Sequence, residues 1–338
     1  MIEIDGSFGE GGGQILRTSL ALSAVLGQPV KVINIRARRP RPGLAPSHVT
    51  SIEAVAELCD AEVDGLFAGS KEIVFKPGQL TGGDFEFDVG TAGSISLVVQ
   101  TCLLPASLSR SRVTLTVRGG TDVNWSPPID YMRLVHLPML AKFGPSCDIE
   151  IASRGFYPEG GGQVTAEITP VSKLEAADLS RRGEIVEIIG VAFAQNLPEH
   201  IVSRIKHAAV KELAGFKRVQ IETDLRRGHS TGAGIVLTAM CENAIIGSSS
   251  LGAKGIRSES LGENCAVDLQ DTLSTGATVD DHMLDQILPY MALAEGKSAV
   301  LTDELTEHAK TNMWVIEKLL GRGFDLSQQE GLKRLAAG

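Results

Sequence analysis

The chain has 338 residues, 43% of them hydrophobic and 22% charged, and its formal net charge is −9. These values are typical of a soluble globular protein with a sizeable core and a length that corresponds to about two domains. The acidic balance argues against a protein that coats a nucleic-acid duplex, because such a protein would be basic throughout.

Cysteine usage and the N-terminus indicate the compartment. The five cysteines are scattered without a Cys-x-x-Cys pair, so we expect neither a zinc site nor a disulfide framework. The first residues do not resemble a signal peptide, and no apolar run approaches the ~20 residues that span a bilayer. We therefore expect a cytoplasmic protein with no membrane contact.

The first functional signal is the segment Gly-Glu-Gly-Gly-Gly-Gln-Ile-Leu-Arg at residues 9–17, which leads into an apolar segment with helical spacing. Its glycines allow backbone N–H groups to close around an anion at a helix N-terminus. Glu10 is a hard oxygen ligand suited to Mg²⁺ beside phosphates, and Gln14 and Arg17 fall on one helix face. The segment favours a nucleotide or phosphate site with its metal; the alternative is a plain strand-to-helix turn with a surface arginine.

A basic surface follows this segment. Residues 11–52 contain no Asp or Glu, and the Pro-rich stretch 36–43 is a semi-rigid loop that carries several arginines, with Ser47 and His48 at the start of the next helical pattern. Local positive charge on an acidic protein indicates a small anionic target. A solvated basic loop is the alternative.

The predicted elements alternate along the chain. We expect strands near 2–4, 30–35, 72–75, 85–89, 113–117, 149–151 and 164–168, and helices over 15–26, 49–59, 92–108 and 129–142. The segments 1–76 and 84–169 each follow the order strand, helix, strand, helix, strand, strand. The C-terminal part repeats this order with helices over 281–293 and 306–320, a strand at 299–301 and short strands near residues 324 and 332.

The pattern predicts an α/β fold of three βαβαββ structural repeats. The repeats form a large domain over residues 1–182 and 275–338, and a small α/β domain over residues 183–274 is inserted in the third repeat. For this insert we expect strands at 185–193, 219–222, 235–240 and 244–248 and a helix over 200–213.

Three further glycine-rich stretches stand out. The stretch 90–94 opens the helix that carries Gln100, and it is either a second anion site or a helix start packed in the core. The stretch 119–122, followed by Pro127 and Pro128, is typical of a rigid ligand loop. The stretch 155–163 repeats Gly-Gly-Gly-Gln but continues into a strand, so we expect it to shape a turn and to have no catalytic role.

His308 is the histidine with the clearest chemical potential. It falls in the first turn of a predicted helix, where the helix dipole disfavours imidazolium and favours the neutral, nucleophilic ring. A neutral imidazole can hold a phosphoryl or nucleotidyl group covalently; a capping or surface histidine is the alternative. Asp285, on the preceding helix, is expected to reach the same end of the fold.

In this order and spacing, the motifs resemble the RNA 3′-terminal phosphate cyclase family over nearly the whole chain. The resemblance is carried by residues 9–17, 35–39, 42–44, His48, 93–94 with Gln100, 119–122, 155–162, and His308 with 311–312. The family fold is three βαβαββ units with a small inserted α/β domain.

The resemblance implies a nucleotidyl-transferring ligase that converts an RNA 3′-terminal phosphate to a 2′,3′-cyclic phosphate with ATP and a divalent metal, Mg²⁺ or Mn²⁺. Its partners are the RNA 3′-phosphate end and ATP, and a homo-oligomer is compatible with it. His308 would carry AMP covalently, and AMP would then pass to the RNA 3′-phosphate as an adenylate anhydride. By residue-by-residue correspondence, the metal ligand would be Glu10, the RNA phosphate ligands would be Arg17, Arg39 and His48, and the ATP site would contain Gln14, Gln100, Pro127, His282 and Asp285.

Two positions depart from the family pattern: His282 stands where a tyrosine is expected against the nucleotide, and Ser47 stands where some members have glutamine. Two other classes share parts of the pattern. A ribosome-assembly relative lacks the nucleophilic histidine, and enolpyruvyl transferases share the repeated fold but have no use for a covalent histidine. His308 together with Glu10 and the arginines favours the cyclase.

Overall fold

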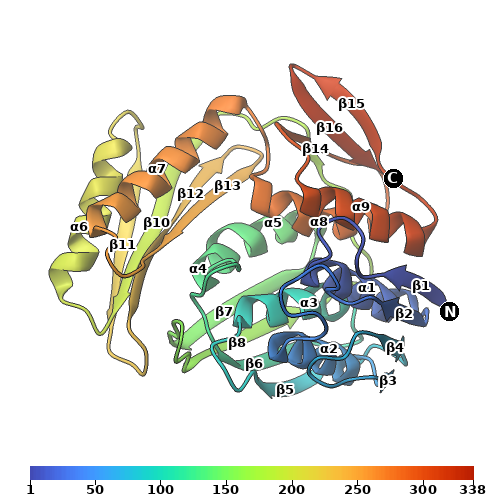
Figure 1. Ribbon diagram of the computed structural model, residues 1–338. Coiled ribbons are helices and arrows are strands. Elements are labelled where there is room, and N and C mark those ends of the chain that lie inside the picture. Colours follow the sequence, from blue (N-terminus) through green and yellow to red (C-terminus); the bar gives the residue numbers. More distant parts are fainter.

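Helices and strands alternate in the computed structural model, which describes residues 1–338 and confirms the mixed α/β class (Figure 1). The helices are α1 (Gly13–Leu26), α2 (Pro46–Leu58), α3 (Ile95–Ser107), α4 (Ile129–Tyr131), α5 (Leu137–Leu140), α6 (Glu199–Glu212), α7 (Ser258–Thr275), α8 (Asp281–Leu293) and α9 (Glu307–Leu320). The strands are β1 (Ile2–Asp5), β2 (Val30–Ile33), β3 (Glu62–Asp64), β4 (Ile73–Lys76), β5 (Gly83–Asp88), β6 (Val113–Gly119), β7 (Ser146–Ser153), β8 (Gly162–Thr169), β9 (Asp178–Leu179), β10 (Ile185–Gln195), β11 (Val219–Arg226), β12 (Gly232–Cys241), β13 (Ile245–Leu251), β14 (Ser298–Thr302), β15 (Asp325–Gln329) and β16 (Leu332–Ala337).

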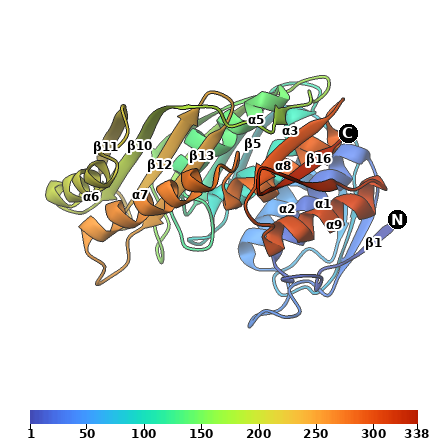
Figure 2. The same cartoon turned by 90° about the horizontal axis from the view of Figure 1, so that it is seen from above.

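Three of the four sheets have the same strand order. Their orders are β1-β2-β4-β3, β5-β6-β8-β7 and β9-β14-β16-β15. In each sheet the first pair is parallel and the other two pairs are antiparallel. The fourth sheet, β11-β10-β12-β13, and helices α6 and α7 fall between β9 and α8 in the sequence. Figures 1 and 2 show this part at one end of an elongated molecule, with both termini at the other end.

The first and second sheets bury mainly one face, as the alternation in β2, β6 and β8 shows, whereas every residue of β14 is buried. In β8, for example, Val164, Ala166 and Ile168 are fully buried while the residues between them are partly exposed. The largest core cluster has 66 buried residues, and a second cluster of 20 residues lies between the fourth sheet and helices α6 and α7. Helix α1 packs on α3 and α9, and this packing brings the start of the chain to its C-terminal part.

A buried ion cluster joins the fourth sheet to the second. Arg154 is fully buried and contacts Asp122 at 3.1 Å, Asp130 at 2.5 Å and Asp224, on β11, at 2.9 Å. Its guanidinium also lies over the ring of Phe193, on β10, at 4.1 Å. Burial disfavours the charge, but the three carboxylates outweigh it and raise the pKa of Arg154. The cluster therefore fixes the loop after β6 against the fourth sheet.

Several boundaries differ from the sequence expectation. Strand β2 ends at Ile33, where the expected strand continued to residue 35, because Asn34 turns the chain with φ = 53°. Helix α2 begins at Pro46, which suits the first helical position. The expected helix over 129–142 is interrupted by a π-helical turn at Met132–His136 and ends in a 3₁₀ turn at Ala141–Phe143, whereas a continuous α-helix was expected.

Three elements have no counterpart in the expectation: the three-residue strand β3, the two-residue strand β9 and the long helix α7. None of the helices combines the length and the apolar character needed to cross a bilayer. All five cysteines are free thiols.

Candidate active site

The glycine-rich segment 9–17 covers the end of the turn between β1 and α1 and the first five residues of α1. Gly9 has φ = 56° and lies directly against the hydroxyl of Thr311, on α9, so a side chain at residue 9 would be both strained and blocked. Gly13 lies in the same way against the His48 ring and the Arg17 guanidinium. No side chain caps the N-terminus of α1, so its first N–H groups are free to bind an anion.

Glu10 contacts one residue of the C-terminal helix α9 and one residue of the loop 36–43. Its Oε2 atom is 3.2 Å from His308 Nε2 and 3.3 Å from Arg39 Nη2. His308 is the second residue of α9, as expected, and the Thr306 hydroxyl caps this helix by accepting a hydrogen bond from the Ala309 N–H. Burial lowers the pKa of His308, and although Glu10 opposes this, Arg17 and Arg39 lower it further. These effects favour the neutral imidazole, whose side chain is 48% exposed and whose Nε2 atom faces Glu10.

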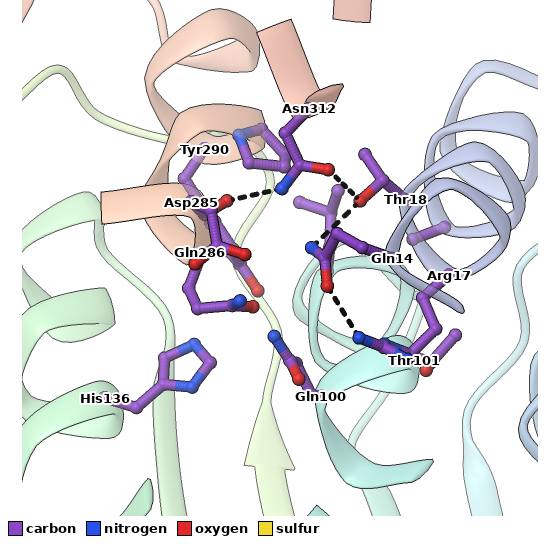
Figure 3. Close-up of a pocket in the computed structure, with 13 residues that line it drawn as sticks. Gln14, Arg17, Thr18, Gln100, Thr101, His136, Asp285, Gln286, Tyr290 and Asn312 are labelled. Atoms are coloured by element: carbon purple, nitrogen blue, oxygen red, sulfur yellow. Dashed lines mark hydrogen bonds between the residues drawn. The ribbon is translucent and has the colours of Figure 1, made fainter. Parts of the chain in front are cut away.

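A small cavity of about 30 Å³ is lined mainly by polar residues, among them Gln14 and Asn312, which lie four residues after Glu10 and His308 in the sequence. It brings together four of the residues expected in the site, namely Gln14, Arg17, Gln100 and Asp285 (Figure 3). Gln14 Oε1 accepts a hydrogen bond from Arg17 Nη2 at 2.6 Å, as expected for side chains three residues apart on one helix face.

A second set of bonds joins helix α1 to helices α8 and α9 across this cavity. The Thr18 hydroxyl donates to Asn312 Oδ1 at 2.7 Å, and Asn312 Nδ2 donates to the backbone carbonyl of Asp285 at 2.8 Å (Figure 3). Because Asn312 lies four residues after His308, this network fixes the helix that carries the histidine.

Two charged side chains of the cavity, Asp285 and Arg17, have shifted pKa values, and two of the buried polar atoms around the cavity lack a partner. Burial raises the pKa of Asp285 to about 7, although Arg17 lowers it, and burial lowers the pKa of Arg17 to about 10. Arg17 Nε and Gln100 Oε1 are buried without a hydrogen-bond partner. Unpaired buried donors and acceptors are costly, and a bound nucleotide or phosphate would satisfy them.

The buried carboxyl of Asp285 makes stability depend on pH. Its folded pKa exceeds the unfolded value of 3.8, so the folded protein holds the proton more tightly and loses stability as pH rises from about 4 through 7. We expect Asp285→Asn to stabilise the protein at pH 8, by a few kcal/mol as an order of magnitude, and to change it little at pH 5. Thermal unfolding of both proteins at the two pH values measures this. Equal shifts at pH 5 and pH 8 would contradict it.

His48 lies beside Arg17. Its Nδ1 accepts a hydrogen bond from the Ala45 N–H at 3.0 Å, so the neutral ring carries its proton on Nε2, which faces Gly13. Burial, followed by Arg17 and Arg36, lowers the pKa of His48 to about 3. His48 is therefore a neutral hydrogen-bond donor next to a guanidinium, a pairing that suits a phosphate oxygen.

Two of the residues expected in the ATP site lie outside the cavity. Pro127 is half-buried in the loop between β6 and α4, and His282 is exposed at the start of α8, with its ring 6.2 Å from that of Tyr131 in an edge-on arrangement. Neither lines the cavity.

The cavity also contains residues that the sequence did not single out, including His136, Gln286 and Thr101. His136 is buried in the π-helical turn, and burial lowers its pKa to about 4. His136 falls within a predicted helix rich in apolar residues, so its residue type was the only feature that could have indicated a place in the site.

The site fits a divalent cation only together with a phosphate ligand. Glu10 provides one carboxylate, and no group of three or more His, Cys, Asp or Glu side chains is arranged to hold a metal ion. Mg²⁺ is commonly bound by one or two carboxylates with substrate phosphates and water. Glu10, with the free N–H groups of α1 behind it, is suited to this arrangement.

Comparisons with known proteins agree with the motifs. A family model described as RNA 3′-terminal phosphate cyclase matches residues 8–326. Three relatives that carry the name RNA 3′-terminal phosphate cyclase are similar over nearly their whole length. The relative from Pyrobaculum aerophilum is 47% identical over 334 residues (98% of this chain and 96% of that protein), that from Archaeoglobus fulgidus is 47% identical over 324 residues (95% and 96%), and that from Nitrosospira multiformis is 42% identical over 340 residues (100% and 96%).

Proposed function

Because the chain belongs to the RNA 3′-terminal phosphate cyclase family, it is an enzyme, and we propose that it converts the 3′-terminal phosphate of RNA into a 2′,3′-cyclic phosphate. ATP supplies the activation and is converted to AMP and pyrophosphate. The observation that carries the proposal is the contact of Glu10 with both His308 and Arg39, together with the cavity that Arg17 lines. Incubation of a 3′-phosphorylated RNA with ATP should make its terminal phosphate resistant to phosphatase.

We propose that His308 is the nucleophile of a three-step reaction. With its proton on Nδ1, the neutral ring attacks the α-phosphorus of ATP through Nε2, an N–P bond forms, and pyrophosphate leaves. An oxygen of the RNA 3′-phosphate then takes the AMP from His308, and an RNA–adenylate anhydride results. Finally the neighbouring 2′-hydroxyl attacks the 3′-phosphorus, loses its proton, and expels AMP. Positioning and charge neutralisation carry most of the catalysis in such transfers.

The remaining side chains bind and orient. Glu10 would hold the divalent metal, Mg²⁺ or Mn²⁺, which neutralises phosphate charge when it is bound. Arg17, Arg39 and His48 would bind the RNA terminal phosphate. Gln14, Gln100 and Asp285 would line the nucleotide site, and the loop of Pro127 and the ring of His282 would contact the nucleotide from outside the cavity.

The architecture is proposed in the same terms. Residues 1–182 and 275–338 form a large domain of three βαβαββ repeats, and residues 183–274 form an inserted small domain. The common strand order of three sheets and the separate core of the fourth support this division. We further propose a cytoplasmic protein that acts on RNA ends, with an architecture compatible with a homo-oligomer.

Arg39→Ala should weaken the step that uses RNA more than the step that uses ATP. A guanidinium binds phosphate through two parallel hydrogen bonds, so its loss should raise KM for 3′-phosphorylated RNA by about 10-fold or more. Lysine should restore this only in part. Steady-state cyclisation and the rate of self-adenylylation are to be measured separately.

Arg41→Ala is the matched control, because Arg41 lies in the same exposed loop two residues away. We expect it to leave both steps within a factor of about two. Equal losses in both steps for Arg39→Ala would place Arg39 in the ATP site.

A further inference from the structure

A second and larger cavity lies away from the Arg17 cavity. It is a polar groove of about 300 Å³, lined by residues at one end of the β5–β8 sheet and by His229 in the loop that joins β11 to β12. None of its lining residues is hydrophobic, and four are glycines. The side chains that carry its chemistry are Asp88, Thr91, Arg118, Glu159, Gln163 and His229.

Two glycine-rich stretches lie between the groove and the helix that carries His48. A Cβ built on Gly93 would lie 3.1 Å from Ser47, the neighbour of His48. A Cβ on Gly160 would lie 3.0 Å from Ala92, and one on Gly161 would lie 2.8 Å from His229. The two glycine-rich stretches 90–94 and 155–163 therefore pack on each other and lead from His48 to the loop of the fourth sheet.

The charge of the groove indicates which chemistry it recognises. Arg118 is its one permanent cation, and Asp88 and Glu159 are two carboxylates. This balance does not favour a row of backbone phosphates. Carboxylate, amide and hydroxyl groups instead suit ribose 2′-hydroxyls and base edges, which distinguish RNA from DNA. Tyr157, in the same loop as Glu159, is 74% exposed and offers a face for base stacking.

We propose that this groove binds the nucleotide that precedes the RNA 3′ end, through its ribose hydroxyl and base. A volume of about 300 Å³ is at the lower end of the roughly 300–1,000 Å³ of ligand pockets and suits one nucleotide unit of a single strand. The inference rests on the proposed function, because it assumes that the terminal phosphate binds at Arg17 and His48.

The test is the affinity for a fluorescein-labelled six-nucleotide RNA 3′-phosphate, measured by anisotropy, with an unlabelled nucleoside 3′,5′-bisphosphate as the competitor that has no preceding nucleotide. The wild type should bind the hexamer about 5- to 10-fold more tightly than the bisphosphate, as expected from one or two additional hydrogen bonds. A hexamer with deoxyribose at every position except the 3′ end should lose part of this advantage, because it keeps the base but not the ribose hydroxyl.

The variant Arg118→Ala/His229→Ala should remove most of the hexamer advantage and leave the affinity for the bisphosphate and the rate of self-adenylylation unchanged. Arg112→Ala is the matched control, since Arg112 precedes the opposite end of β6 and also contacts β8, at Glu167. It should change none of these quantities, and retained self-adenylylation shows that each variant is folded.

Equal wild-type affinities for the hexamer and the bisphosphate would overturn the inference, and so would a double variant that weakens both equally. The proposed function fails by a different result. In that result, the wild type cyclises neither ligand while the double variant still loses affinity for the hexamer alone. It would support the groove as a nucleotide site and contradict the proposed cyclase activity.

Discussion

His308→Ala should abolish formation of a protein–AMP adduct, a loss of about 10⁴-fold or more, because removal of a covalent nucleophile leaves only binding and electrostatic effects. The expected adduct is a phosphoramidate, which is labile in acid and stable in alkali. Incubation of the wild type with α-labelled ATP and a divalent metal should give labelled protein with this lability, and the variant should give none.

His200→Ala is an unusually close control. His200 is the second residue of α6, which has 14 residues and begins with glutamate, and His308 is the second residue of α9, which has the same length and the same first residue. His200 is exposed and has none of the Glu10, Arg17 or Arg39 neighbours of His308. Its loss should leave labelling intact, so the helix N-terminus alone does not make the nucleophile.

RNA that already carries the 3′-adenylate anhydride separates the first step from the last. The final step needs the 2′-hydroxyl and the bound phosphate, so His308→Ala should still cyclise this RNA. Labelling of the variant at the wild-type level would falsify the nucleophile assignment. Failure on the pre-adenylated RNA would mean that His308 also acts in cyclisation.

Arg154→Met should lower the free energy of unfolding by about 3–5 kcal/mol, because it leaves buried carboxylates without their counter-charge. Asp122 and Asp130 are fully buried as side chains. Burial already raises the pKa of Asp122, and Arg154 opposes this rise. Without Arg154 that pKa should rise further, so the folded state would bind the proton more tightly and the loss of stability should grow as pH rises. Urea unfolding at pH 5 and pH 8 measures both effects.

Two further variants identify charge as the cause. Arg112→Met removes an ion pair whose two side chains are 58% and 49% exposed, and it should cost less than about 1 kcal/mol. The triple variant Arg154→Met/Asp122→Asn/Asp130→Asn should recover a large part of the loss. If it is no more stable than Arg154→Met, lost packing and not unpaired charge explains the deficit.

What the sequence could predict depended on how local the controlling interactions are. The 3.6-residue period placed α8 over residues 281–293 without error, and the contact between Gln14 and Arg17 follows from their three-residue spacing. Strand β3 has only three residues, too few for an alternation to be visible. Helix α7 was missed because its buried stripe includes Gly262, Cys265 and Ala266, which give weak apolar periodicity.

The site itself depends on long-range packing. Residue types and the family resemblance identified Glu10 and His308, but their 3.2 Å contact comes from the packing of α9 on α1. The Arg154 cluster draws its carboxylates from the loop after β6, from α4 and from β11, and no local pattern links these segments. Burial of His136 in a π-helical turn is likewise set by the tertiary fold.

The placement of the fourth sheet between β9 and β14 has a consequence for how the protein folds. Asp178 pairs with Ala299, 121 residues later, whereas the corresponding strands of the first sheet pair over 28 residues, from Ile2 to Val30. Loop closure over the longer distance costs only about 1.3 kcal/mol more, but it delays pairing until the intervening chain has folded. On the ribosome, the first two sheets can be complete before β14 is made. Since His308, the partner of Glu10, lies on α9, the proposed nucleophile is synthesised late, and the site can form only after α9 has been made.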